Sequence, residues 1–240
     1  MSFHHVLTNG VNLQQFGEKT KTIFTMADTA SDEFTIGLIL VQTCLLLFLE
    51  FSNDKILPKF YARKTCHALS GFNIMMLDPN NYLARNYVYL VVVVSISMTY
   101  QVGGLKPFRF ATARDPGIVL YLLLVATWFY SRLNPVVLAP VFFADPAGAV
   151  VGKFITNNTS LTNPRLIGKK TFFGSLAVFV AAYFTIFSYP VRPTIPVARR
   201  AVVAALIVIA EALGGTDFDN LFVALVVVCD WAIPLGSMVL

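Results

Sequence analysis

Long apolar runs fill most of the chain, and Pro, Asn, Gly and charged residues mark the breaks between them. Runs of this length approach the roughly 20 residues that a helix needs to cross a membrane, so they predict transmembrane helices. Eight segments are predicted: 34–51, 65–77, 86–103, 117–132, 135–151, 172–189, 199–213 and 220–237. Because the second is short for a hydrocarbon core about 30 Å thick, we expect it to be partial or re-entrant.

The composition agrees with this pattern. Of 240 residues, 56% are hydrophobic and 13% are charged, about half the charged share of a soluble domain. The predicted fold class is an all-α, polytopic transmembrane bundle of about seven to eight spans. We expect residues 1–32 to form a polar N-terminal arm and residues 33–240 to form one transmembrane domain, since no long polar linker divides them. Three cysteines, an odd number, argue against a disulfide framework and predict buried free thiols.

The distribution of basic residues predicts an orientation. If eight spans alternate, one side of the membrane receives 11 Lys and Arg residues and the other receives seven. The positive-inside rule makes the richer side cytosolic. That side also carries the basic motifs near residues 63 and 170 and the acidic turn 214–220. Because the basic residues are scattered between apolar runs, nucleic-acid binding is excluded, and membrane lipids and phosphate-bearing ligands are the expected partners.

The fifth segment contains Asp145 followed by Pro146, in the middle of an apolar run. A carboxylate at membrane depth is costly, so Asp145 must be paired, protonated or bound to a metal ion. Gly148 and Gly152 offer a second interpretation of the same stretch, because GxxxG is a helix-packing motif. The stretch is not a Walker A loop, which needs one more residue between its glycines and a Ser or Thr after Lys153.

Three further motifs each allow two interpretations. In YARKTCHALSG (61–71), Lys64 and His67 share a helix face, either as part of an interfacial anchor or as phosphate-binding groups. In GKKTFFGS (168–175), Thr171 caps a helix whose free N–H groups bind an anion, unless the lysines are only a stop-transfer cluster. In EALGGTDFDN (211–220), the acids either stabilise a helix start or hold Mg²⁺.

Taken in order, the four motifs resemble those of the CTP-dependent lipid kinases, which include dolichol, phytol and farnesol kinases and the yeast-type diacylglycerol kinase. The resemblance covers roughly residues 60–240. The matching positions are Arg63, Lys64, His67 and Gly71; Asp145, Gly152 and Lys153; Lys170, Thr171, Gly174 and Ser175; and Glu211, Asp219 and Asn220. The chain departs from the family pattern at Ala144 and Gly148, and a polar segment replaces a glycine-rich run after Gly152.

The resemblance implies a kinase that transfers the γ-phosphoryl group of CTP to the hydroxyl of a polyprenol, phytol, farnesol or diacylglycerol. The implied catalytic residues are Asp145, His67 and Glu211, with Asp145 and Asp219 holding Mg²⁺. The implied nucleotide and phosphate ligands are Arg63, Lys64, Gly152, Lys153, Lys170, Thr171, Gly174 and Ser175. The expected location is the endoplasmic reticulum membrane of a eukaryote, or a plastid or prokaryotic cell membrane, with the site facing the cytosol.

Two other functions remain open at this point. A cytidylyltransferase that makes a CDP-lipid would use the same nucleotide and metal, although its longer C-terminal signature is absent. A small transporter could use Asp145 as its coupling carboxylate, although the sequence contains no inverted repeat. The oligomeric state and the identity of the lipid are left open.

Overall fold

The computed structural model describes residues 32–186, 195–215 and 217–232. Within this part of the chain, 76% of the residues are helical and eight α-helices occur. They are α2 (Asp32–Phe51), α3 (Lys59–Met76), α4 (Tyr82–Thr99), α5 (Pro116–Tyr130), α6 (Ala139–Asn158), α7 (Phe172–Ile186), α8 (Val197–Gly214) and α9 (Asp219–Ala232). The 3₁₀ turns η1 (Val102–Gly104) and η2 (Pro135–Leu138) and a hairpin of β1 (Arg165–Ile167) and β2 (Lys170–Thr171) complete the described elements.

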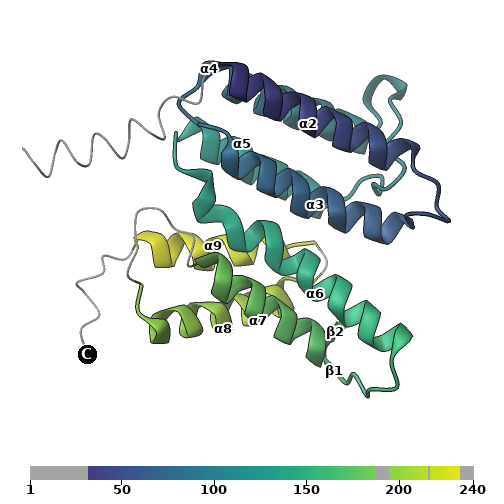
Figure 1. Ribbon diagram of the computed structural model, residues 1–240, viewed down its shortest axis with the longest axis vertical. Coiled ribbons are helices and arrows are strands. Elements are labelled where there is room, and N and C mark those ends of the chain that lie inside the picture. Colours follow the sequence, from purple (N-terminus) through teal and green to yellow (C-terminus); the bar gives the residue numbers. More distant parts are fainter. Residues whose placement is uncertain (1–31, 187–194, 216, 233–240) are drawn as a thin grey trace, which may run out of the picture.

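The helices form two groups with α6 between them (Figure 1). Helices α2, α3, α4 and α5 lie on one side, and α7, α8 and α9 lie on the other. Helix α6 packs mainly against α7 and also contacts α3 and α9. Successive helices run in opposite directions, so the connections 52–58, 100–115 and 159–171 and the turn after Gly214 meet at one end of the bundle. We call this the polar end.

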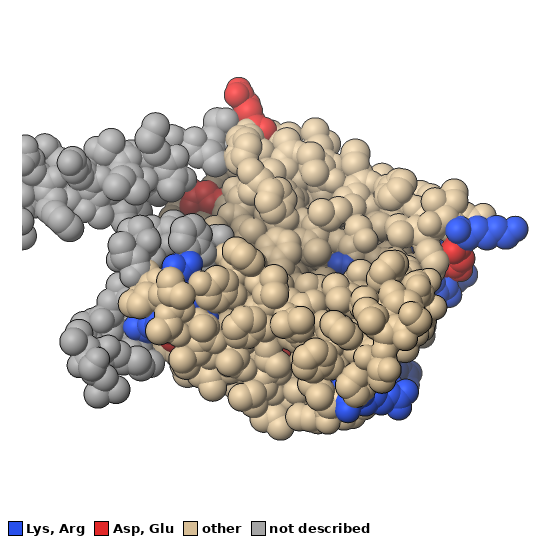
Figure 2. All heavy atoms as spheres, turned by 60° about the horizontal axis from the view of Figure 1, so that its bottom comes forward, with Lys and Arg blue, Asp and Glu red and all other residues tan. Residues whose placement is uncertain are grey.

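Three described helical segments are long and apolar enough to cross a membrane: Asp32–Phe51, Tyr82–Thr99 and Pro135–Asn158. Helices α5 and α7 are also apolar but have only 15 residues each. The described part of each of the eight predicted segments is therefore mainly helical, while three described segments meet the length and composition of a span. Figure 2 shows a face that is mostly uncharged, with charged side chains concentrated towards its edges. Exposed apolar side chains such as Leu40 on α2 and Leu90 on α4 suit a lipid-facing surface.

Helix α3 is longer than the predicted segment 65–77. It begins at Lys59, directly after Pro58, and its 18 residues span about 27 Å. The basic residues of its first turns are good helix formers, so the helix continues out of the apolar run toward the polar end. The helix is therefore longer than predicted, but α3 is too polar to count among the three spanning segments, and a partial or re-entrant segment stays a prediction.

Helix α6 continues to Asn158 instead of ending at residue 151. The polar residues in its last turns bond to carbonyl groups four residues earlier in the helix. Thr156 Oγ1 donates to Gly152 O at 2.8 Å, and Asn158 Nδ2 donates to Phe154 O at 3.1 Å. Because these side chains are satisfied within the helix, a polar sequence extends it rather than ending it.

Other sequence predictions meet the structure only in part. The arm 1–32 lies outside the described residues except for Asp32, as do the ends of segments 172–189 and 220–237.

The cysteines are free, but Cys44 and Cys229 are exposed, so the expectation of buried thiols is wrong for both. Cys66, on α3, is half-buried. The largest core cluster is centred on fully buried side chains such as Phe129, Phe142 and Ile207.

Candidate functional site

Asp145 on α6 forms a buried ion pair with Lys64 on α3. Lys64 Nζ donates to both carboxylate oxygens of Asp145, at 2.8 and 2.7 Å. Gly71 makes this approach of the two helices possible, because a Cβ at that position would lie 2.4 Å from Phe142 Cβ. The prediction that Asp145 needs a partner is confirmed, and its partner is a lysine.

His67 lies one turn beyond Lys64 on α3 and faces the same carboxylate. Its Nδ1 is 3.6 Å from Asp145 Oδ2, and its Nε2 donates to Val141 O at 3.2 Å. Because a carbonyl oxygen only accepts, Nε2 carries the hydrogen and Nδ1 of the neutral ring is an acceptor. The histidine is therefore held in a fixed orientation with an acceptor nitrogen beside Asp145.

A second cluster joins Lys170 to two acids. The hairpin of β1 and β2 places Lys170 Nζ against Glu211 Oε1 on α8 and 3.6 Å from Asp219 Oδ2 at the start of α9. Gly214 permits the tight connection between α8 and α9, because a Cβ there would lie 2.4 Å from Asp219 Cα. This connection brings Glu211 and Asp219 to the same lysine.

The pKa values of Asp219 and Lys170 reflect the burial and the charges of this cluster. Burial raises the pKa of Asp219 to about 6, and the negative charge of Asp145 adds to the effect. Burial alone would lower the pKa of Lys170, but Glu211 outweighs it and holds that pKa above its usual value. Asp219 therefore binds a proton more readily than an ordinary aspartate, while Lys170 stays charged.

The two clusters meet. Carboxylate oxygens of Asp145, Glu211 and Asp219 all lie within 4.8 Å of one another. Three carboxylates are a suitable donor set for Mg²⁺, which prefers oxygen ligands. Lys64 and Lys170 already neutralise part of this charge, and the group of five side chains carries a net charge of −1 when all are ionised.

The glycines of α6 and α7 allow the two helices to pack closely. A Cβ at Gly148 would lie 2.4 Å from Val178 Cγ2, and a Cβ at Gly152 would lie 2.8 Å from Thr171 Oγ1. A Cβ at Gly174 would lie 2.9 Å from Gly148 O. The helix-packing interpretation of GxxxG is therefore confirmed. These glycines allow the second half of α6 to pack closely against the start of α7.

The start of α7 was expected to have free backbone N–H groups that bind an anion. Gly174 N donates to Thr171 Oγ1 at 3.4 Å, which confirms Thr171 as a capping residue. Phe173 N donates to Asn163 Oδ1 at 3.1 Å, and Phe172 N donates to Pro164 O at 2.9 Å. The expectation of free N–H groups is thus wrong at these three positions, because the preceding loop already supplies acceptors. Ser175 is buried one residue further along.

A polar cavity of about 760 Å³ lies at the polar end beside these clusters. Its size is within the usual range for small-molecule sites. Its walls include four acids, namely Asp115, Glu211, Asp217 and Asp219, and seven basic residues, namely Arg63, Lys64, Arg114, Lys153, Arg165, Lys169 and Lys170. This excess of positive charge suits a ligand with several phosphate groups.

Two of the predicted phosphate ligands have different surroundings from those expected. Arg63 Nη2 donates to Asp115 Oδ2 at 2.6 Å, so its charge is already paired. Lys153 Nζ lies 3.9 Å from the centre of the Phe60 ring, and no ion pair joins it to a described acid. Lys153 is thus the more available cation of the two.

Sequence reasoning missed Asp115 and Asn163. Asp115 Oδ1 accepts from Gly117 N and Ile118 N at the start of α5, and Pro116 follows it, a pattern typical of a helix N-terminus. Asn163 links the end of α6 to the start of α7, donating to Gly152 O and Thr156 Oγ1. The sequence offered a signal for Asp115 but none for Asn163.

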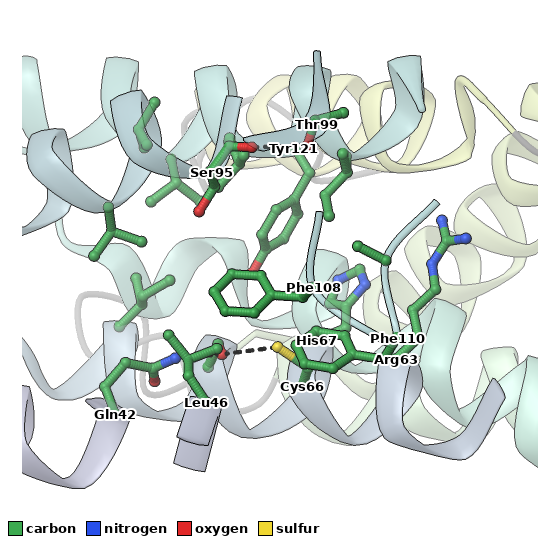
Figure 3. Close-up of a pocket in the computed structure, with 18 of the residues that line it drawn as sticks. Gln42, Leu46, Arg63, Cys66, His67, Ser95, Thr99, Phe108, Phe110 and Tyr121 are labelled. Carbon is green, nitrogen blue, oxygen red and sulfur yellow. Dashed lines mark hydrogen bonds between the residues drawn. The ribbon is translucent and has the colours of Figure 1, made fainter. Parts of the chain in front are cut away.

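A second, apolar cavity of about 170 Å³ lies among α2, α3, α4 and α5 (Figure 3). Of its 29 lining residues, 13 are Val, Leu, Ile, Phe or Tyr. Polar residues such as Gln42, Asn73 and Ser95 also line it, and its polar end includes His67 and Asp145. Arg63, Lys64 and Asp219 line both this cavity and the polar one. The two cavities therefore meet at the cluster of acids and lysines.

No known protein family, curated protein or solved structure matches the chain. The resemblance to CTP-dependent lipid kinases therefore depends on the four sequence motifs.

Proposed function

We propose that the protein is a membrane-bound lipid kinase that transfers the γ-phosphoryl group of CTP to the hydroxyl of a long-chain alcohol. The observation that supports this most directly is the meeting of a basic polar cavity with a narrow apolar cavity at Lys64 and Asp219. A nucleotide suits the first cavity and a lipid chain suits the second. Phosphoryl transfer requires little beyond positioning the two reactants and neutralising charge.

In the proposed reaction, the alcohol oxygen attacks the γ-phosphorus. An O–P bond forms, the bond between the γ-phosphorus and the bridging oxygen breaks, and CDP leaves. The proton of the alcohol passes to a carboxylate and then to solvent. Asp145 is the best candidate acceptor, because it lies at the polar end of the apolar cavity, and the ring of His67 lines the same part of the cavity beside it.

The carboxylates also suit the metal that accompanies a nucleotide. Asp145, Glu211 and Asp219 would hold Mg²⁺, which when bound neutralises phosphate charge. Lys153 on α6 and Lys170 on β2 both line the polar cavity, where they would contact the phosphates. The choice of CTP over ATP follows only from the sequence resemblance, as does the orientation of the site toward the cytosol.

The experiment uses purified full-length protein in detergent with Mg²⁺, a panel of lipid alcohols and CTP labelled at either the γ- or the α-phosphate. We expect the lipid product to carry label from the γ-position only. Label from the α-position would instead identify a cytidylyltransferase acting on an endogenous lipid phosphate. If no alcohol leads to consumption of CTP, ATP, GTP or UTP, the kinase proposal is wrong and the transporter hypothesis gains support.

A further inference from the structure

The loop between α4 and α5 holds an arginine in an unfavourable backbone conformation. Arg114 has a φ of 54°, in the left-handed region that residues with a Cβ rarely adopt. Its backbone N–H donates to Thr99 O at the end of α4, at 2.9 Å. Backbone strain of this kind persists where the surrounding structure enforces it, and it clusters at functional sites. A glycine would fit this backbone better, so the guanidinium is the part of Arg114 that needs an explanation.

Arg63 fixes this loop on both sides of Arg114. Its Nη1 donates to Thr112 Oγ1 at 3.3 Å, and its Nη2 donates to Asp115 Oδ2 at 2.6 Å. Asp115 Oδ1 accepts from two backbone N–H groups at the start of α5. Both oxygens of the acid next to Arg114 are therefore engaged elsewhere, and the loop is held in place by contacts that do not use the Arg114 side chain.

The side chain of Arg114 lies on the wall of the polar cavity. It is exposed, and no hydrogen bond or ion pair joins its guanidinium to another described residue. Arg114 lines the polar cavity together with Lys170 and Asp219, and it does not line the apolar one. An arginine presents five N–H donors in a planar fork that matches the oxygens of a phosphate group. An anion with several phosphate groups is therefore the ligand that this side chain suits best.

We propose that Arg114 binds the phosphate chain of a nucleoside triphosphate in the polar cavity. The identity of the ligand as a nucleotide rests on the proposed kinase function, whereas the binding of a polyphosphate chain by Arg114 can be tested without turnover. Arg114 lies outside the four sequence motifs. It is better placed for this role than Arg63, whose charge is already paired with Asp115.

The test measures binding of inorganic tripolyphosphate, with Mg²⁺, to the purified full-length protein in detergent by calorimetry. Arg114→Gly removes the guanidinium and suits the left-handed backbone. We expect it to weaken tripolyphosphate binding about tenfold, the scale of one charge-assisted contact, without lowering the melting temperature. Arg114→Lys keeps the charge but loses the fork, so it should weaken binding about threefold. Equal affinity in the wild type and Arg114→Gly would overturn the proposal.

Arg132→Gly provides a matched control at the opposite end of α5. Arg132 is also exposed and has a φ of 55°, but it follows the last residue of this helix, which is about 22 Å long. The substitution should likewise not lower the melting temperature, and it should leave tripolyphosphate binding unchanged. An equal loss of affinity in Arg132→Gly would mean that net charge alone is responsible, and the assignment to Arg114 would be wrong.

Phosphatidate presents the same phosphate chemistry on a lipid. Because Arg114 does not line the apolar cavity, dioleoyl phosphatidate in mixed micelles should not displace tripolyphosphate, and effective displacement would refute the assignment to a nucleotide. Binding is measured without a lipid alcohol. Arg114-dependent binding by a protein that phosphorylates no alcohol would therefore contradict the kinase proposal and leave this inference intact. An active kinase whose Arg114→Gly variant binds tripolyphosphate normally would contradict this inference alone.

Discussion

Replacing Asp145 by Asn tests the centre of the proposed site. The change keeps the size of the side chain but removes its negative charge, and with it the bidentate ion pair to Lys64 at 2.8 and 2.7 Å. It also removes one of three carboxylates within 4.8 Å of one another. Loss of a proton acceptor that also binds metal should lower kcat at least about 10³-fold, equivalent to about 4 kcal/mol.

The effect on stability should be smaller. The asparagine oxygen still accepts one bond from Lys64, so we expect a cost of about 2 kcal/mol, the scale of one charge-assisted hydrogen bond. Since proteins are stable by about 5–15 kcal/mol, such a loss leaves most molecules folded and cannot by itself remove activity. Turnover of radiolabelled CTP and the melting temperature in detergent should therefore respond very differently to the substitution.

Asp230→Asn provides a matched control. Asp230 is 7% exposed, close to the 8% of Asp145, and accepts from Arg199 Nε at 2.7 Å. It lies 11 residues beyond Asp219 on α9, about 16 Å from the polar end. We expect a comparable loss of stability with turnover nearly unchanged. If Asp145→Asn keeps a tenth of wild-type turnover, or Asp230→Asn is equally inactive, the assignment of the site is wrong.

Three further predictions concern packing, nucleotide binding and pH. Gly148→Ala should lower the free energy of unfolding by about 1–3 kcal/mol, measured by thermal unfolding, because its Cβ would lie 2.4 Å from a side chain of α7. Gly37→Ala is the control, because its Cβ would have no atom within 4 Å, and it should stabilise helix α2 slightly. Lys153→Ala should raise the KM for CTP about tenfold and leave that for the alcohol unchanged, and exposed Lys106→Ala should change neither. The pKa of Asp219 is about 6, and protons compete with metal for its carboxylate. The affinity for Mn²⁺, measured by calorimetry, should therefore be constant above pH 6 and fall about tenfold per pH unit below it. Unchanged affinity at pH 5 would contradict a role for Asp219 as a ligand.

The elements of the fold could largely be predicted from the sequence, because each apolar run is a local signal. All eight predicted segments are helical, and the largest errors were at polar ends, where α3 begins earlier and α6 ends later than expected. Those errors have a local cause. The side chains of residues such as Thr156 bond to their own helix, so a polar stretch that looks like a loop remains helical.

The pairing of charges could not be predicted in the same way. Asp145 clearly required a partner, but Lys64 lies 81 residues away, and its choice over Lys153 depends on how α3 sits on α6. That relation is fixed by the contact of Gly71 with Phe142, a matter of shape that periodicity does not encode. The pairing of Arg63 with Asp115 is of the same kind, because it depends on a loop between α4 and α5.

Under the proposed function, the lysines of the site would connect the binding of metal to the binding of nucleotide. Lys64 and Lys170 are bonded to the carboxylates, yet both also line the polar cavity, where phosphates would lie. Mg²⁺ alone would have to displace two ammonium groups and leave them without a partner, which is costly at buried positions. A nucleotide that arrives with the metal offers those groups phosphate oxygens in exchange. Under the proposed function, metal and nucleotide would therefore bind together, and the two lysines stabilise three neighbouring acids by themselves.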